Sequence, residues 1–191
     1  RNTEFKVSNL KPSTRFYQFI DGNSGVDFIP KLIEIANSTS LANYGTSSGS
    51  FQIGETVVGS AIGLGGNAPS ISFRVATPNH KFGTFNSPSS TYNVNPYVTS
   101  ESIPATYSQT SKVLNVDTAS LSEEAQGLYS GYIIKGMKLV GQTSGAIAYV
   151  KDIRLISDNY GDLIGSFFLR DPHRNPVPSV RLQTGTKTFK I

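Results

Sequence analysis

Short runs of alternating apolar and polar residues recur along the chain, separated by clusters of turn-forming residues. They occupy residues 4–7, 14–20, 31–35, 71–75 and 146–150. A period of two places successive side chains on opposite faces of a strand, so each run predicts a half-buried β-strand. Helical signals occur at one place, where Ser120 and Glu123 have capping-box spacing and Gly127 follows as a stop. The pattern predicts an all-β fold with at most one short helix.

An internal repeat occupies the middle of the chain. Shifting the sequence by 82 positions superposes residues 38–63 on residues 120–145 without a gap and gives nine identities, five of which are glycine pairs. Two apolar pairs fall in the same register: Phe51 with Ile133, and Val57 with Leu139. Matching glycines indicate matching turns, because glycine tolerates positive φ and close backbone approach.

The repeat predicts tandem duplicated small β units, sandwich-like or barrel-like, over residues 30–86 and 111–169. We expect Val58 and its counterpart Val140 to be buried between the matched turns. The remaining segments are predicted to be an N-terminal β-hairpin region (1–29), an extended connection containing Pro, Ser, Thr and Tyr (87–110) and a C-terminal β-hairpin (170–191) that turns near Gly185. The chain starts without Met and stops inside an alternating run, so we expect it to belong to a longer polypeptide.

Composition narrows the class of protein. Charged residues make up 16% of a chain that contains 18 Gly, 10 Pro and no Cys. This mixture disfavours helices and favours strands joined by tight turns. The lack of Cys excludes disulfides and thiolate metal sites, and no apolar run is long enough to predict a membrane span. The net charge of +4 is scattered, without an RNA-binding motif or recognition helix, so we expect no nucleic-acid partner.

Catalytic signals are weak throughout. A nucleophilic triad needs a His beside a Ser or Cys, but His80 and His173 both lie in turn-like sequences and no Gly-x-Ser-x-Gly elbow occurs. Glu55 could serve in glycan cleavage, yet it lies between Gly54 and Thr56 in a predicted turn whose repeat counterpart is Met137. We therefore expect a protein that is not an enzyme and needs no cofactor.

Two groups of residues are candidates for binding a ligand: two aspartates in one loop and three tyrosines in the connection 87–110. Asp158 and Asp162 flank an oxygen-rich, Gly-containing loop that resembles a calcium loop but lacks its terminal Glu, and an ordinary hairpin turn is the alternative. The connection 87–110 carries one charged residue and three aromatic rings, Tyr92, Tyr97 and Tyr107. We expect it to be ordered and to bury at least one ring; fully exposed rings would instead favour stacking on sugars.

Four runs of sequence together resemble virion structural proteins of contractile-tailed bacteriophages, in particular those that infect marine cyanobacteria. The clearest is Ser-Gly-x-Phe-x-Ile-Gly-Glu-Thr-Val-Val-Gly at residues 48–59; the others lie at 9–22, 141–148 and 182–190. The resemblance implies a tail, baseplate or fibre component located in the virion. It also implies partners among other virion proteins and self-association of this chain, and it supplies no catalytic residues. The alternative is a carbohydrate- or receptor-binding module that contacts a glycan of the host surface, with Tyr92, Tyr97 and Tyr107 as its candidate residues.

Overall fold

The computed structural model describes residues 2–36, 45–61, 69–123, 128–170, 182 and 184–191. These residues form sixteen strands and one short helix, α1 (Thr118–Glu123). The all-β prediction is confirmed, and α1 falls where the capping-box spacing placed a helix.

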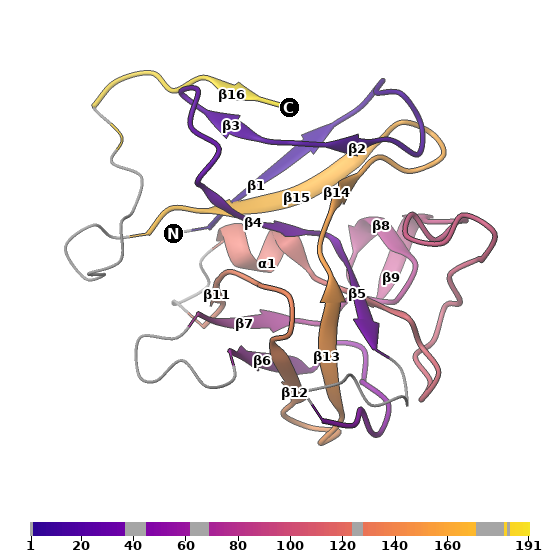
Figure 1. Ribbon diagram of the computed structural model, residues 1–191. Coiled ribbons are helices and arrows are strands. Elements are labelled where there is room, and N and C mark those ends of the chain that lie inside the picture. Colours follow the sequence, from indigo (N-terminus) through magenta and orange to yellow (C-terminus); the bar gives the residue numbers. More distant parts are fainter. Residues whose placement is uncertain (1, 37–44, 62–68, 124–127, 171–181, 183) are drawn as a thin grey trace.

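Seven strands form one antiparallel sheet, which fills the lower half of Figure 1. In spatial order they are β10 (Val113–Asn115), β5 (Leu32–Ala36), β13 (Ile147–Asp152), β12 (Lys138–Gly141), β6 (Thr56–Ser60), β7 (Ser70–Arg74) and β11 (Ser130–Gly131). The sheet returns to its first strand, because Val75 bridges Val116 and the Ala76 N–H donates to the Asn115 carbonyl at 3.0 Å. The six strands from β10 to β7 thus close into a ring, which we call the barrel.

The two ends of the chain together form a second layer, the terminal unit, at the top of Figure 1. Its strands pair as follows: β1 (Asn2–Val7) and β4 (Asp27–Pro30) flank β15 (Leu163–Phe168), β2 (Arg15–Phe16) pairs with β14 (Leu155–Ile156), and β3 (Phe19–Ile20) pairs with β16 (Phe189–Lys190). The expectation of an N-terminal hairpin over 1–29 is therefore wrong, since those strands pair with the C-terminal part of the chain. Phe5, Phe167 and Phe189 pack together at the centre of this unit.

The C-terminal segment contains β16, which pairs with β3. Gly185 has a positive φ of +120°, as the predicted turn requires. The expected first arm of the hairpin falls largely on residues 180, 181 and 183, which lie outside the described residues. The expectation that the last strand packs on the rest of the fold is confirmed by the contact of Phe189 with Phe5.

Alternation decides which side chains fill the barrel. Along β6 and β7, Val57, Ile71 and Phe73 point inward and are almost fully buried. The predicted burial of Val58 is wrong: it is 39% exposed, and Val140 is half-buried. A shift of one residue moves a strand position to the opposite face, so Val57 and Leu139 take the core positions instead.

Strand register in the barrel follows the repeat. β6 and β12 pair around Val58 and Val140, positions that the 82-residue shift equates; the flanking pairs are Val57 with Gly141 and Gly59 with Leu139. The repeat relates Val57 to Leu139 and Gly59 to Gly141, so it converts one flanking pair into the other. Two copies related by a local two-fold axis would pair in this way. A shift of 81 positions matches residues 31–35 with 112–116, and the alternating run 71–75 corresponds to the run 146–150. Ile35 pairs with Val150, and their counterparts Val116 and Val75 pair with each other.

This correspondence ends beyond Val75 and Val150. In the first predicted copy the next strand, β8 (His80–Thr84), forms a hairpin with β9 (Ser87–Thr91), whereas the matching strand of the second copy, β15, lies between β1 and β4. The duplication stays a prediction, and the strands to which it now applies are those of the barrel.

Candidate functional site

The loop predicted to hold a metal follows β14 and carries Asp158 and Asp162. Asp158 Oδ1 accepts hydrogen bonds from the backbone N–H groups of Tyr160 and Asp162, both at 2.9 Å, and the Asp158 N–H donates to the Asp162 carbonyl. The N-terminal segment braces this loop, because the Leu10 N–H donates to the Gly161 carbonyl at 2.9 Å. The loop is therefore a closed turn with one aspartate folded inward.

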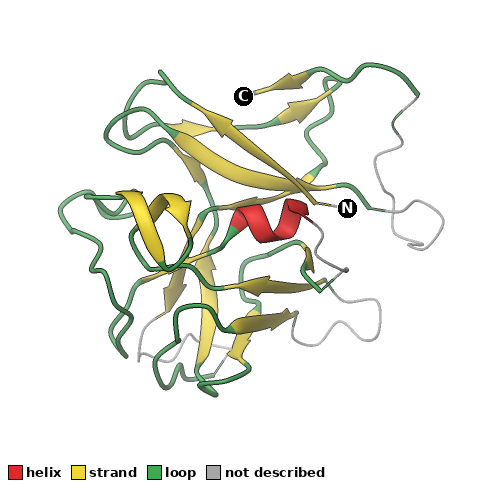
Figure 2. Cartoon of the chain, turned by 180° about the vertical axis from the view of Figure 1, so that it is seen from behind, coloured by secondary structure: helices red, strands yellow, loops and turns green. Residues whose placement is uncertain are grey.

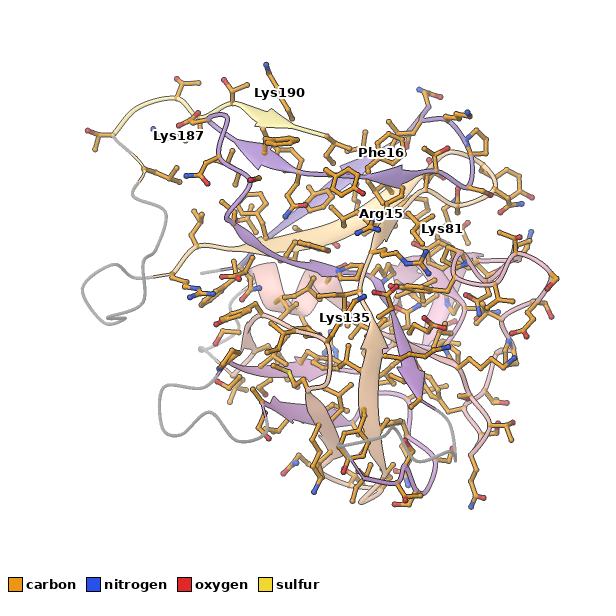
Figure 3. The ribbon with its side chains drawn as sticks, viewed as in Figure 1. Arg15, Phe16, Lys81, Lys135, Lys187 and Lys190 are labelled. Carbon is orange, nitrogen blue, oxygen red and sulfur yellow. The ribbon has the colours of Figure 1, made fainter. Side chains whose placement is uncertain are left out.

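Lys81, on β8, lies between the two aspartates and was not singled out by the sequence. Its Nζ is 2.5 Å from Asp158 Oδ2 and also contacts the Asp162 carboxylate. The side chains of Lys81 and Asp158 are only 4% and 1% exposed. We call Lys81, Asp158 and Asp162 the Lys81 triad; Figure 3 shows Lys81 between the β8–β9 hairpin and the terminal unit. The two aspartates do come together as the sequence predicted, but an ammonium group occupies the position that a metal cation would take.

Charge in the triad is balanced within the protein. Burial lowers the pKa of Lys81, but the two carboxylates outweigh it, so the pKa is raised above its ordinary value. Burial raises the pKa of Asp162, yet hydrogen bonding to Lys81 and Ser8 lowers it overall. The rings of Phe82 and Tyr160 flank the ammonium at 5.4 and 5.2 Å. Within the described residues, no group of three or more His, Cys, Asp or Glu side chains could hold a metal ion.

The three candidate tyrosines pack inside the protein. Tyr92 is 6% exposed and packs with Leu32, so the prediction of an ordered connection that buries at least one ring is confirmed. The Tyr97 hydroxyl donates to the Leu32 carbonyl and the Tyr107 hydroxyl to the Ala76 carbonyl, both at 2.7 Å. Burial raises the pKa of all three phenols. Because these rings cover the barrel, they do not form an exposed platform for a sugar.

Glu55 is buried and bonded on both carboxylate oxygens. Oε1 accepts from the Gln52 N–H at 2.6 Å, and Oε2 accepts from the N–H groups of Thr143 and Ser144 at 3.1 and 3.0 Å. The Ser144 hydroxyl also donates to Oε1 at 2.8 Å. The carboxylate thus ties the turn before β6 to the turn between β12 and β13, and a substrate could reach it only after these bonds break.

Equivalent glycines make room for Glu55 and for Met137, its counterpart in the repeat. A Cβ at Gly141 would lie 2.6 Å from Glu55 Oε2, and a Cβ at Gly59 would lie 2.8 Å from Met137 Sδ. Gly54 and Gly136 both have positive φ, +87° and +80°, in the preceding turns. In both copies, therefore, a glycine without a Cβ leaves room for the side chain that follows the turn. That side chain is the carboxylate of Glu55 in one copy and the thioether of Met137 in the other.

His80 and Lys31 are two further buried ionisable residues. The His80 imidazole is 3.0 Å from the Gly83 carbonyl through Nε2, and its pKa is lowered by burial and by the nearby Lys31 charge. Lys31 is 3% exposed and donates to the Val116 carbonyl at 3.2 Å; burial lowers its pKa to about 8 against the opposing charges of Asp117 and Glu4. Sequence reasoning did not single out Lys31, because a lysine within an alternating strand run gives no local signal of burial. Its repeat counterpart, Lys112, is 47% exposed. His173 lies outside the described residues.

Side chains also join the terminal unit to the barrel. The Asn2 amide donates to the Gly131 carbonyl at 2.9 Å and accepts from the Gly131 N–H at 3.0 Å, which extends the hydrogen bonding of β11 by one side chain. The Thr118 hydroxyl of α1 donates to Glu4 on β1 at 2.7 Å. Figure 2 shows α1 between the two layers. Polar side chains thus contribute to the contact between the two layers.

The outer surface carries a few exposed rings and lysines. Tyr17 is 59% exposed and Tyr160 is 64% exposed. Phe19, two residues after Tyr17, is 37% exposed. Figure 3 shows Lys187 and Lys190 around β16, at the outer edge of the terminal unit. Lysines beside an edge strand disfavour edge-to-edge aggregation.

A surface pocket of about 130 Å³ lies in the connection after β9, where Asn95, Glu101 and Lys112 are among its lining residues.

Comparison of the chain with protein-family models, with curated protein sequences and with solved structures found no match. Among the residues that the structure describes, no helix has the length and apolar character needed to cross a membrane.

Proposed function

We propose that this chain is a non-catalytic structural module of a bacteriophage virion, part of the tail, the baseplate or a fibre. It assembles there with other virion proteins and with further copies of itself. The resemblance of residues 9–22, 48–59, 141–148 and 182–190 to virion proteins of contractile-tailed phages supports this class of function.

One structural observation carries the proposal: the buried carboxylate of Glu55 and the buried ammonium of Lys81 bond to other parts of the chain. Glu55 ties two turns of the barrel, and Lys81 ties β8 to the turn after β14. General acids, bases and nucleophiles must reach a substrate. Groups that bond to other parts of the fold instead stabilise a rigid body, which is what an assembly module requires.

The residues of the resemblance have this same structural role. The run 48–59 supplies Gly54 and Glu55, which form the turn and the carboxylate tie before β6. The run 141–148 supplies Ser144, which is bonded to that carboxylate. The two runs therefore meet in space and stabilise one corner of the barrel, so their likeness to virion proteins concerns the fold and not an active site.

The test is the location of the chain and of its gene. The reading frame that encodes the chain should lie among genes for tail and baseplate proteins, and peptides such as residues 138–151 should be found in purified, density-banded particles. A gene with metabolic neighbours, together with particles that lack these peptides, would refute the proposal.

The alternative function is contact with a carbohydrate or receptor on the host surface. The exposed rings of Tyr17 and Tyr160 favour it, because rings stack on sugar faces and the Arg15 guanidinium lies 4.9 Å from the Tyr17 ring. A glycan array separates the two functions. Saturable binding that is lost in Tyr17→Ala and kept in Leu128→Ala, a change at another exposed apolar side chain, would support the alternative. An empty array would leave the structural role standing alone.

A further inference from the structure

The Lys81 triad has a geometry that an ordinary ion pair does not explain. Asp158 Oδ2 is buried and accepts no hydrogen bond from the described part of the chain, although Lys81 Nζ lies only 2.5 Å away. A lysine in a buried ion pair normally donates along a lone pair of the carboxylate oxygen. Here the contact is close but lacks hydrogen-bond geometry, and the oxygen that the amine touches is bonded directly to Cγ.

The other carboxyl oxygen is held in a different way. Asp158 Oδ1 accepts two backbone hydrogen bonds, from Tyr160 and Asp162, each at 2.9 Å. Two converging N–H groups stabilise negative charge that develops on a carbonyl oxygen when a nucleophile adds to its carbon. The Asp162 carboxylate, which also contacts Lys81 Nζ, is a proton acceptor beside the amine.

We propose that Lys81 and Asp158 condense to form an intramolecular isopeptide bond, with Asp162 as the proton relay. Asp162 takes a proton from the Lys81 ammonium and passes it to Asp158 Oδ2. The neutral amine attacks Cγ, and the charge on Oδ1 is held by the two N–H groups. Asp162 then moves a second proton from nitrogen to Oδ2, which leaves as water. The ammonium and the carboxylate thus become one amide and one water, and Asp162 returns to its ionised form.

Proximity supplies the driving force. Well-oriented intramolecular partners reach effective molarities of about 10⁵–10⁸ M, which can reverse an equilibrium that favours hydrolysis between free molecules. The bond also removes two buried charges whose desolvation is costly. The Lys81 and Asp158 side chains are 4% and 1% exposed, and the Phe82 and Tyr160 rings flank the site, so little water is available for the reverse reaction. The amide would join the β8–β9 hairpin covalently to the turn after β14.

A second close pair provides a matched control. Lys112 also lies in short contact with a carboxylate, that of Glu101, but these side chains are 47% and 35% exposed and bonded to each other with hydrogen-bond geometry. That pair is accessible to water, and no backbone N–H group of the described residues bonds to its carboxylate. We expect no condensation there.

The experiment is mass spectrometry of the full chain, and it does not depend on the proposed virion role. Denatured wild-type protein should weigh one water less than its sequence, and a digest should contain one branched peptide that joins Lys81 to Asp158. Lys81→Arg and Asp158→Ala should restore the full mass, Lys112→Arg should keep the loss, and Asp162→Ala should slow its appearance in freshly made protein.

Two results would overturn the inference. One is a wild-type chain of full sequence mass, a measurement that requires no variant to fold. The other is a loss of water that persists in Lys81→Arg, because it would arise from an aspartate succinimide, for which Asp21 before Gly22 is an ordinary position.

Discussion

Replacing Glu55 by Gln tests whether its carboxylate holds the barrel turns together. The carboxylate presents two acceptor oxygens to three backbone N–H groups, those of Gln52, Thr143 and Ser144. An amide keeps one oxygen and turns an NH₂ group toward the remaining donors. Either the Gln52 N–H or the Thr143 and Ser144 pair therefore loses its acceptor, whichever way the amide is oriented.

The expected loss follows from these contacts. A hydrogen bond to a charged group contributes about 1.5–3 kcal/mol, and a buried donor left without a partner costs about 1–3 kcal/mol. We expect Glu55→Gln to lower the free energy of unfolding by about 2–4 kcal/mol, and Glu55→Ala to lower it by at least as much. The position is 6% exposed, so water cannot readily replace the lost acceptor.

Urea denaturation followed by circular dichroism measures this free energy, with an unchanged m-value as the sign that both variants unfold from the same state. Glu101→Gln is the control, because it weakens an exposed ion pair with Lys112 and should cost no more than about 1 kcal/mol. If Glu55→Gln unfolds within about 0.5 kcal/mol of wild type, in the range of an ordinary surface substitution, the carboxylate does not tie the turns.

Three further predictions concern buried and crowded positions. Folding lowers the pKa of Lys31 from 10.5 to about 8, so between these pH values the unfolded chain binds one proton more than the folded chain. The free energy of unfolding of wild type, relative to that of Lys31→Met, should therefore rise by on the order of 3 kcal/mol from about pH 8 to pH 10.5. A difference that does not change with pH in urea titrations would contradict this. Tyr107→Phe leaves the Asn115 N–H without the hydroxyl it bonds at 3.1 Å and should cost about 1–3 kcal/mol in the same assay; a cost near zero would mean that water replaces the hydroxyl. Gly131→Ala should be much more destabilising than Gly145→Ala in thermal unfolding, because a Cβ would lie 2.1 Å from a carbonyl oxygen at Gly131 and meets nothing within 4 Å at Gly145; equal melting temperatures would show that this backbone adjusts freely.

Local features of the fold could be predicted from the sequence because they depend on neighbouring residues. Alternation identified the strand around Ile71, and the shared Gly54 and Gly136 marked turns that do have positive φ. Alternation gives the two faces of a strand but not which face is buried, and for Val58 the choice was wrong.

Long-range pairing could not be read in the same way. β1 pairs with β15 and β3 with β16, between strands at opposite ends of the chain. Short strands of two to six residues have many possible partners, and the pairing is decided by the packing of Phe5 with rings from β15 and β16. A nearby turn gave the simpler prediction of local hairpins, and tertiary packing overrode it.

The candidate sites show the same limit. Asp158 and Asp162 were recognised as a pair of oxygen ligands, but Lys81 lies far from them in sequence and gives no local signal that it will neutralise them. The three tyrosines of the connection were recognised as aromatic residues with a shared role, and that role is to cover the barrel. In both cases the residue types were informative, whereas the direction of each side chain required the fold.

The most direct test of the proposed virion role is a cryo-electron microscopy reconstruction of the phage particle whose genome encodes the chain. The account predicts density in the tail, the baseplate or a fibre that fits the closed barrel with its terminal unit, in contact with neighbouring virion proteins and present in symmetric copies. A complete reconstruction of those parts in which every domain is assigned to other chains would contradict it.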